Sequence, residues 1–173
     1  KSGGETMNRV CMQRKSIRKF EEKPVEKEKE ILLLESAMQA PSATNQQPWE
    51  YIVIRNKDIL EKLSNVSTGA WPLKKAPLGI VTLMRETGNK SNMRPQDMAA
   101  STENILLEAV EQGLGGVWIG AYPLEERTDK IKDILGISED LTPFNMIALG
   151  YPAESEKVSI KKRYDASRVK RID

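Results

Sequence analysis

Four short apolar runs, separated by longer stretches of helical character, constrain the fold of this chain more than any other feature. Runs of this length that are bounded by Gly, Pro and Asn are typical of buried strands. None reaches the ~20 residues that span a bilayer. We therefore expect one sheet covered by helices, in a mixed α/β or α+β domain. The runs lie at residues 51–54, 78–84, 116–119 and 145–149.

Helices are predicted in the stretches between these runs. Pro24 and the acidic residues after it favour a helix start. Apolar residues then recur at helical spacing, at Ile31, Leu34 and Met38. The predicted helices span residues 24–40, 57–66, 95–112 and 124–135.

Glycines and polar stretches mark the boundaries of these elements. Gly113 is expected to form a left-handed cap after one helix, and Gly136 to end the next. Residues 41–48 and 85–95 are polar and are predicted to be loops. The small residues at 99–102 leave two readings open. They can reflect helix propensity alone, or a surface that another backbone or a flat ligand approaches closely.

The length of 173 residues suits a single domain, which we place at residues 7–173. We expect the KSGGET segment at residues 1–6 to be a remnant of cloning. The chain has one cysteine, Cys11, and no histidine. This composition excludes a zinc site built on His and Cys, a Ser-His-Asp triad and a Cys-His pair. Cys11 is interpreted as a small residue rather than a nucleophile, and an enzyme of this composition relies on a bound cofactor.

The C-terminal segment is strongly basic. Residues 161–173 carry a net charge of +4, so the rest of the chain carries −2. A basic tail can bind nucleic acid, but Tyr164 is the only aromatic residue in it, so no stacking platform is expected. We favour a solvated terminus or a local anion site. No signal peptide is recognised, so a cytoplasmic protein without membrane association is expected.

The segment RKSIRKF at residues 14–20 is the first candidate for a binding site. Residues 14, 16 and 18 share one side of an extended segment. Two guanidiniums and a hydroxyl then converge, a combination that suits a phosphate group. The alternative is an ordinary basic surface.

Two further segments are candidates. PSATNQQPW at residues 41–49 offers hydroxyls and amides that could contact the polar edge of a planar heterocycle, or it is simply a turn between helix and strand. GLGGVWIG at residues 113–120 allows a ligand to approach the backbone closely, or it is a helix cap followed by a strand. This second segment is neither a P-loop nor a dinucleotide-binding fingerprint.

These segments, in this order, resemble the nitroreductase family of FMN-dependent oxidoreductases. The resemblance extends from about Met7 to Val169 and is also carried by DMAASTENILLEAVEQGLGGVWIG, ALGYPAE and KKRYDASRV. Each motif alone is weak, but together and in order they are specific. The resemblance implies an α+β, three-layer fold with a central, mostly antiparallel sheet flanked by helices. It also implies an intertwined homodimer with FMN at the interface.

The resemblance also implies the positions of the binding residues. Those expected at the FMN phosphate and ribityl chain are Arg14, Lys15, Ser16, Arg18 and Arg163, with Lys162 as a further candidate. A loop from the other subunit is expected to meet the flavin through Pro41, Ser42, Ala43, Asn45 and Gln47. The segment under the ring is Trp118, Ile119 and Gly120, and the backbone N–H of residue 120 or 121 is expected to face flavin N5.

The implied activity is hydride transfer from NADPH or NADH, through flavin N5, to a small oxidised acceptor such as a nitroaromatic or a quinone, in a ping-pong cycle. No catalytic side chain and no metal are needed for it. Other family chemistry (dehalogenation, enone reduction or flavin degradation) and simple FMN storage remain alternatives. In the 85–95 loop, Met93 and Arg94 stand where family members often place aromatic residues over the substrate. Arg94 can attract an anionic substrate or the 2′-phosphate of NADPH, or it is a solvated charge.

Overall fold

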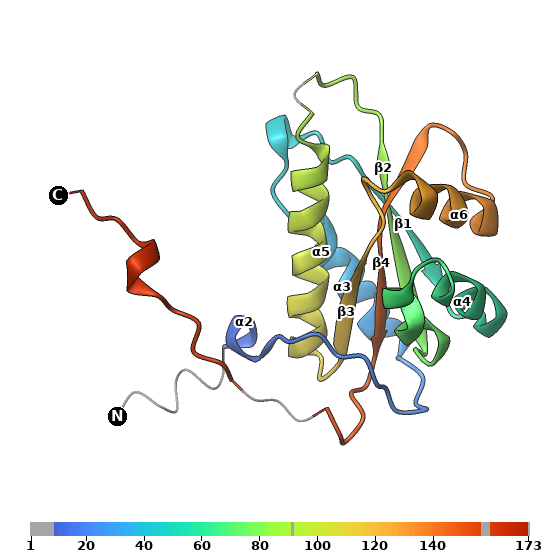
Figure 1. Ribbon diagram of the computed structural model, residues 1–173, viewed down its shortest axis with the longest axis horizontal. Coiled ribbons are helices and arrows are strands. Elements are labelled where there is room, and N and C mark those ends of the chain that lie inside the picture. The colour runs from blue at the N-terminus through green and yellow to red at the C-terminus, as the bar shows by residue number, and fades with distance from the viewer. Residues whose placement is uncertain (1–8, 91, 157–159, 173) are drawn as a thin grey trace.

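The computed structural model describes residues 9–90, 92–156 and 160–172. It contains a four-stranded sheet in which every neighbouring pair of strands is antiparallel. The sheet order is β1 (Trp49–Ile54), β2 (Leu78–Arg85), β4 (Leu141–Gly150) and β3 (Gly115–Gly120) (Figure 1). The N-terminal remnant predicted at residues 1–6 lies outside the described residues.

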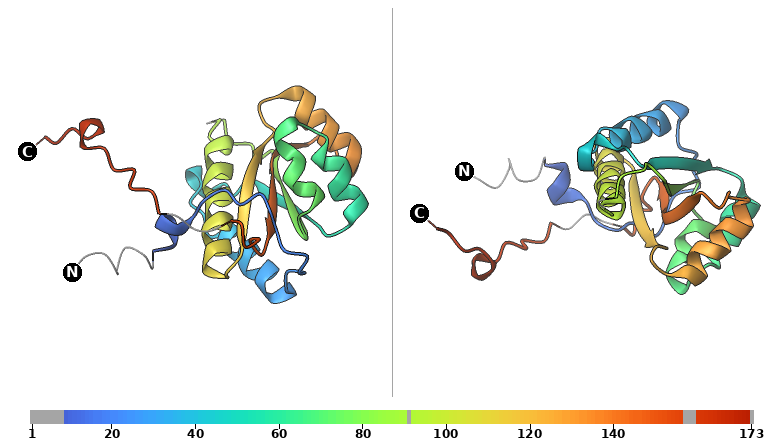
Figure 2. Two further views of the ribbon diagram at one scale, coloured as in Figure 1. Left: turned by 60° about the horizontal axis from the view of Figure 1, so that its bottom comes forward. Right: turned by 90° about the horizontal axis from the view of Figure 1, so that it is seen from above.

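Helices cover both faces of this sheet, so the fold has three layers (Figure 2). One face carries α3 (Lys27–Met38) and α5 (Arg94–Glu111). The other carries α4 (Lys57–Ser64), α6 (Glu125–Leu135) and the 3-10 helix η2 (Thr68–Lys74). Three short pieces complete the fold, namely α2 (Val10–Gln13), η1 (Ala43–Asn45) and η3 (Ala166–Arg168). The predicted α+β, three-layer architecture is confirmed.

Strand β2 shows why the apolar runs are continuous rather than alternating. The side chain of Ile80 packs among residues of α3 and α5, whereas Val81 and Leu83 belong to the cluster formed with α4, η2 and α6. A strand that is buried on both faces needs apolar residues at every position. Each helix predicted from the sequence is present. Gly113 has the predicted left-handed conformation, with a φ of 72°, and Gly136, predicted only to end its helix, has a φ of 62°.

Helix α3 departs from its prediction in two ways. It begins at Lys27, three residues after Pro24, with Glu26 at the N-cap position. Its buried face is Leu33 and Ala37, whereas Ile31 and Met38 of the predicted apolar stripe are exposed. The rotation of the helix is fixed by buried Glu30, which forms an ion pair of 2.7 Å with Arg55 beside β1.

Strand β4 is longer than predicted because it continues through Pro143 to Leu141. Residues Leu83 and Thr82 of β2 pair with Pro143 and Asn145, so Phe144 is the extra residue of a β-bulge. A proline, which has no N–H to donate, is tolerated in a strand at such a bulge.

The small residues of α5 are explained by contact with the sheet of the same chain. Ser101 and Thr102 are fully buried. Ser101 shares a hydrogen bond of 2.6 Å with the hydroxyl of Tyr51, and burial raises the pKa of Tyr51 to about 12. Thr102 accepts a hydrogen bond of 3.0 Å from the amide of Asn145. At Ser101 and Thr102 the close approach is therefore made by β1 and β4, whereas Ala99 and Ala100 are only half-buried.

Candidate functional site

A cationic cavity lies where the N-terminal segment and the C-terminal tail meet, at the end of the sheet where β3 begins. The cavity has a volume of about 620 Å³. Its lining contains five cationic side chains and one carboxylate. The lining residues are Cys11, Met12, Arg14, Lys15, Ser16, Arg18, Glu156, Lys161, Arg163 and Tyr164.

The N-terminal part of this lining is an extended segment laid along β3. Ser16 forms a parallel bridge with Gly116, and the N–H of Ile17 donates to the carbonyl of Gly116 at 2.9 Å. Arg14, Ser16 and Arg18 all line the cavity, but so does Lys15 between them, so alternation along an extended segment does not by itself select the lining. The structure thus brings together the three residues singled out by their spacing.

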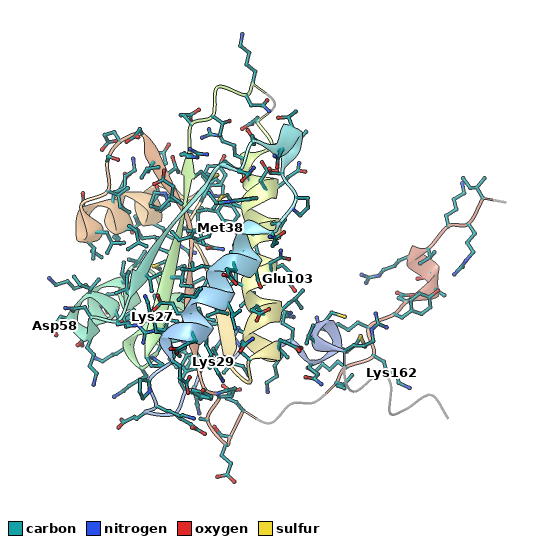
Figure 3. All side chains as sticks on the ribbon, turned by 180° about the vertical axis from the view of Figure 1, so that it is seen from behind. Lys27, Lys29, Met38, Asp58, Glu103 and Lys162 are labelled. Carbon is teal, nitrogen blue, oxygen red and sulfur yellow. The ribbon has the colours of Figure 1, made fainter. Side chains whose placement is uncertain are left out.

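Two carboxylates hold this segment in place. The Nε of Arg14 lies 3.5 Å from Glu103 Oε1, and Figure 3 shows Glu103 on α5. Glu156 accepts hydrogen bonds from the backbone N–H groups of Arg18 (3.2 Å) and Lys19 (3.1 Å). Sequence reasoning missed Glu156, since an isolated acidic residue near a basic tail carries no spacing signal.

The tail contributes Lys161, Arg163 and Tyr164 to the lining, whereas Lys162 lies outside it. All residues at 161–172 are exposed, and the tail extends away from the body of the molecule (Figure 1). Cys11 is exposed beside the same cavity.

The glycines at the start of β3 are required by the chain itself. A Cβ on Gly115 would lie 2.4 Å from the side chain of Ile17, and a Cβ on Gly116 would lie 2.8 Å from that of Leu149. At Gly120, in contrast, no atom would lie within 4 Å of an added Cβ. Only the last of these three glycines therefore borders open space.

Trp118 and Gly120 also present their backbone to the outer edge of the sheet. The N–H of Ala121 donates to the carbonyl of Phe144 at 3.2 Å. Antiparallel pairing alternates, so residues 118 and 120 point their N–H groups away from β4. Trp118 is 37% exposed and stands edge-on to Phe144, while Ile119 is buried on the other face. Of the two candidate N–H groups, that of Gly120 is the one directed outward.

Strand β3 connects these two places. Gly116 lies beside the cationic cavity and Gly120 is four residues further along. At about 3.3 Å per residue, the strand covers roughly 13 Å between them. An elongated ligand with an anionic end can therefore extend along the edge of the sheet from the cavity to Gly120.

The loop at residues 41–47 lies elsewhere in this chain. Among the described residues that line the cavity, none comes from this loop. The predicted residues Pro41, Ser42, Ala43, Asn45 and Gln47 lie instead around the start of α5, where Ala43 N–H donates to Asp97 at 2.9 Å. Sequence reasoning missed Asp97, whose contact with this loop crosses 54 residues.

Arg94 is engaged in the chain and is not directed to a site. Its guanidinium donates to the carbonyl of Arg85 at 3.1 Å and pairs with Glu86 at 2.7 Å. Met93 is exposed beside it. Arg94 therefore fits neither an anion-binding residue nor a free solvated charge, because its guanidinium holds residues 85–86.

Known proteins are similar to this chain in sequence and in fold. The model of a family described as "Nitroreductase family" matches residues 11–98 and 90–151. A Methanothermobacter thermautotrophicus protein named "Putative NADH dehydrogenase/NAD(P)H nitroreductase" is 41% identical over 143 residues, which cover 82% of this chain and 75% of that protein. No helix in the described part of the chain is long and apolar enough to cross a membrane.

Solved structures are similar over nearly the whole chain. A Clostridium acetobutylicum protein named "Putative NADH Oxidase" has a TM-score of 0.89 and 49% identity, covering 93% of this chain and 97% of its own. An "FMN-dependent Nitroreductase" from Clostridium difficile has a TM-score of 0.87 and 30% identity, covering 95% and 98%.

Proposed function

This chain belongs to the nitroreductase family, and on that basis we propose that it is an FMN-dependent oxidoreductase. It takes hydride from NADPH or NADH and passes it to a small oxidised acceptor, such as a nitroaromatic or a quinone. The observation that carries the proposal is the cationic cavity joined by β3 to the outward N–H and open space at Gly120, whose carbonyl accepts from Arg127.

The residues of the cavity fit the phosphate of FMN. Arg14, Arg18 and Arg163 offer forked, charge-assisted hydrogen bonds, and Ser16 offers a hydroxyl. Lys15 adds a further cation, which also lies 3.6 Å from Glu156. Each charged hydrogen bond contributes about 1.5–3 kcal/mol, so the set is sufficient to anchor a dianion.

The ring of the flavin fits the other end of β3. The space beside Gly120 admits a flat group, and the N–H of Gly120 is aimed outward to donate to N5. When bound, FMN supplies the centre that accepts and gives up hydride. The chain orients that centre, and its own residues carry no acid–base step, which is consistent with a sequence without histidine. NAD(P)H and the acceptor use the same open place in turn.

We propose that the working unit is a homodimer. Met38 on α3 and Tyr164 and Ile172 in the tail expose 52%, 74% and 85% of their surface. Exposed apolar side chains on one helix and on an extended arm are typical of an interface between copies. A second copy also explains how the 41–47 loop, which lies away from the cavity of its own chain, meets the flavin.

Anaerobic spectroscopy tests the proposed function. FMN-loaded protein is mixed with NADPH or NADH, and then with a quinone. We expect the flavin absorbance to bleach and then to return. Binding without bleaching by either nucleotide indicates storage of FMN and contradicts the proposal. A parallel screen of nitroaromatics, enones and halogenated aromatics distinguishes the reductase from its relatives with other flavin chemistry.

A further inference from the structure

We propose that Asp97 is a positioning residue that holds two loops at the ring end of the site as one unit. The loops are residues 41–47 and residues 85–90. This inference rests on the proposed function, because it assigns these loops to the flavin and its acceptor. It adds a residue, and a coupling between the two loops, that the sequence motifs do not indicate.

Asp97 occupies the first turn of α5 and is only 5% exposed. One carboxylate oxygen accepts from the N–H of Ala43 at 2.9 Å, and the other accepts from the side-chain amide of Gln46 at 2.6 Å. A buried carboxylate is tolerated here because it is hydrogen-bonded and lies near the positive end of a helix. Asp97 therefore attaches the loop at two points to helix α5.

Three side-chain hydrogen bonds extend this attachment to the second loop. The hydroxyl of Thr87 donates to Gln46 at 2.7 Å. The amide of Asn89 donates to the hydroxyl of Thr44 at 2.7 Å. The guanidinium of Arg85 donates to the carbonyl of Gln47 at 3.1 Å. We call this set, with Asp97, the polar clasp.

The backbone of the first loop shows why the clasp is needed. Thr44, Asn45 and Gln47 have φ values of 51°, 54° and 45°, in the left-handed region that favours glycine. A β-branched threonine is especially unfavourable there. Such a conformation persists only where the surrounding contacts determine it, and strained backbone of this kind clusters at functional sites. Without the clasp, the loop is expected to relax to another shape.

The inference predicts a specific pattern of binding. In Asp97→Ala, the affinities of the apoprotein for FMN and for riboflavin should both fall by about tenfold, because a ring contact is lost and the phosphate contacts are not. The KM for the acceptor should rise in the same variant, since the 85–90 loop moves with the flavin loop. Partial unfolding would weaken both ligands by the same factor but would leave the KM of the folded molecules for the acceptor unchanged, so the rise in KM is the deciding result.

Two variants serve as matched controls. Asp97→Asn keeps the shape, and Gln46 can reverse its amide because the hydroxyl of Thr87 can either donate or accept. We expect its affinities within about threefold of the wild type. Glu111→Ala removes an exposed carboxylate from the other end of α5 and should change nothing.

Hydrogen exchange on the apoprotein tests the coupling without any flavin. In Asp97→Ala, amides in both loops should exchange faster, while those of β2 and β4 keep their protection. If Asp97→Ala does not fold, Thr87→Val replaces it as the test. This change lies in a surface loop, so it should speed exchange at residues 85–90 and leave the fold intact.

The outcomes separate the two proposals. Wild-type protein that binds neither FMN nor riboflavin overturns the proposed function, and exchange alone then decides the coupling. Unchanged riboflavin affinity in Asp97→Ala, or faster exchange in only one loop, overturns the inference.

Discussion

The two ends of the site differ in how the chain builds them. At the phosphate end, the cationic side chains come from the extended N-terminal segment and from the exposed tail. The ionic contacts of Arg14 and Lys15 there are 3.5–3.6 Å long. At the proposed ring end, to which the 41–47 loop of a second copy is assigned, the polar clasp places a buried carboxylate within 2.6–2.9 Å of its donors. Binding of the phosphate is therefore expected to depend on charge and to tolerate small displacements of the side chains. Binding of the ring is expected to depend on the shape of the loop and not to tolerate such displacements.

The largest expected effect comes from removing charge at the phosphate end. In the double variant Arg14→Ala with Arg18→Ala, FMN affinity should fall by about 100-fold or more, since two charged hydrogen bonds are lost. Riboflavin, which has no phosphate, should bind as before. Fluorescence titration of the apoprotein measures both affinities. Lys57→Ala with Lys62→Ala on α4 removes the same charge elsewhere and is the control. An equal loss for riboflavin would contradict the phosphate assignment.

The next largest effect should follow from filling the ring end. In Gly120→Val, no atom beyond the chain neighbours lies within 4 Å of the new Cβ, so we expect the fold to be unchanged. FMN and riboflavin should both bind about 30-fold more weakly, because the added methyl groups occupy the place of the ring.

Gly115→Ala is the opposite case, because its Cβ meets Ile17 at 2.4 Å. It should lower the free energy of unfolding by about 1–3 kcal/mol. Thermal unfolding and titration of the two variants separate an effect on the site from an effect on the fold.

Glu30 lies outside both ends of the site, so its substitution is expected to change the stability of the fold rather than flavin binding. Burial of Glu30 favours its neutral form, but hydrogen bonds from Lys27 and Arg55 outweigh burial and hold the pKa of this carboxyl below its usual range. Glu30→Gln should lower the free energy of unfolding by about 1.5 kcal/mol at neutral pH, which is a modest value because Arg55 is partly exposed.

The pH dependence of this difference has a definite sign. A lowered pKa in the folded state stabilises the protein above the ordinary value of 4.5, and this stabilisation is lost as the pH falls through the folded value. Denaturant titrations of wild type and Glu30→Gln should therefore converge below about pH 4.5. A difference that grows toward acid would show that Glu30 is not the charged partner.

The smallest expected effect is that of salt. Raising ionic strength from about 0.05 M to about 0.5 M should weaken FMN binding by about threefold, because the cations of the cavity are partly exposed and screened. Riboflavin binding should change much less. If salt weakened the binding of FMN and of riboflavin equally, the proposed difference between the phosphate end and the ring end would be contradicted.

The sequence predicts what depends on local pattern. Apolar runs locate the four strands, and Gly113 and Gly136 mark helix ends because a left-handed cap needs no distant partner. The predicted convergence of Arg14, Ser16 and Arg18 is seen in one cavity, although Lys15 between them lines it too. Whether these residues bind FMN stays a prediction.

Features that depend on distant contacts could not be read in the same way. The rotation of α3 is fixed by Arg55, and Asp97 gains its role only when residues 54 apart meet. Glu156 likewise acts on backbone N–H groups 138 and 137 residues away. No local spacing encodes such contacts, so the sequence predicts the frame of the site better than the residues that hold it in place.

The outer edge of β3 has a consequence for how the protein must be handled. The N-terminal segment pairs with its beginning at Gly116, and the guanidinium of Arg127 donates to the carbonyl of Gly120 at 2.9 Å, but no strand among the described residues covers the edge at Trp118. An edge that no strand covers, beside an exposed tryptophan, is a template on which strands of other molecules add. We therefore expect protein made without enough flavin to aggregate, so that the supply of cofactor during expression sets the yield of folded chain.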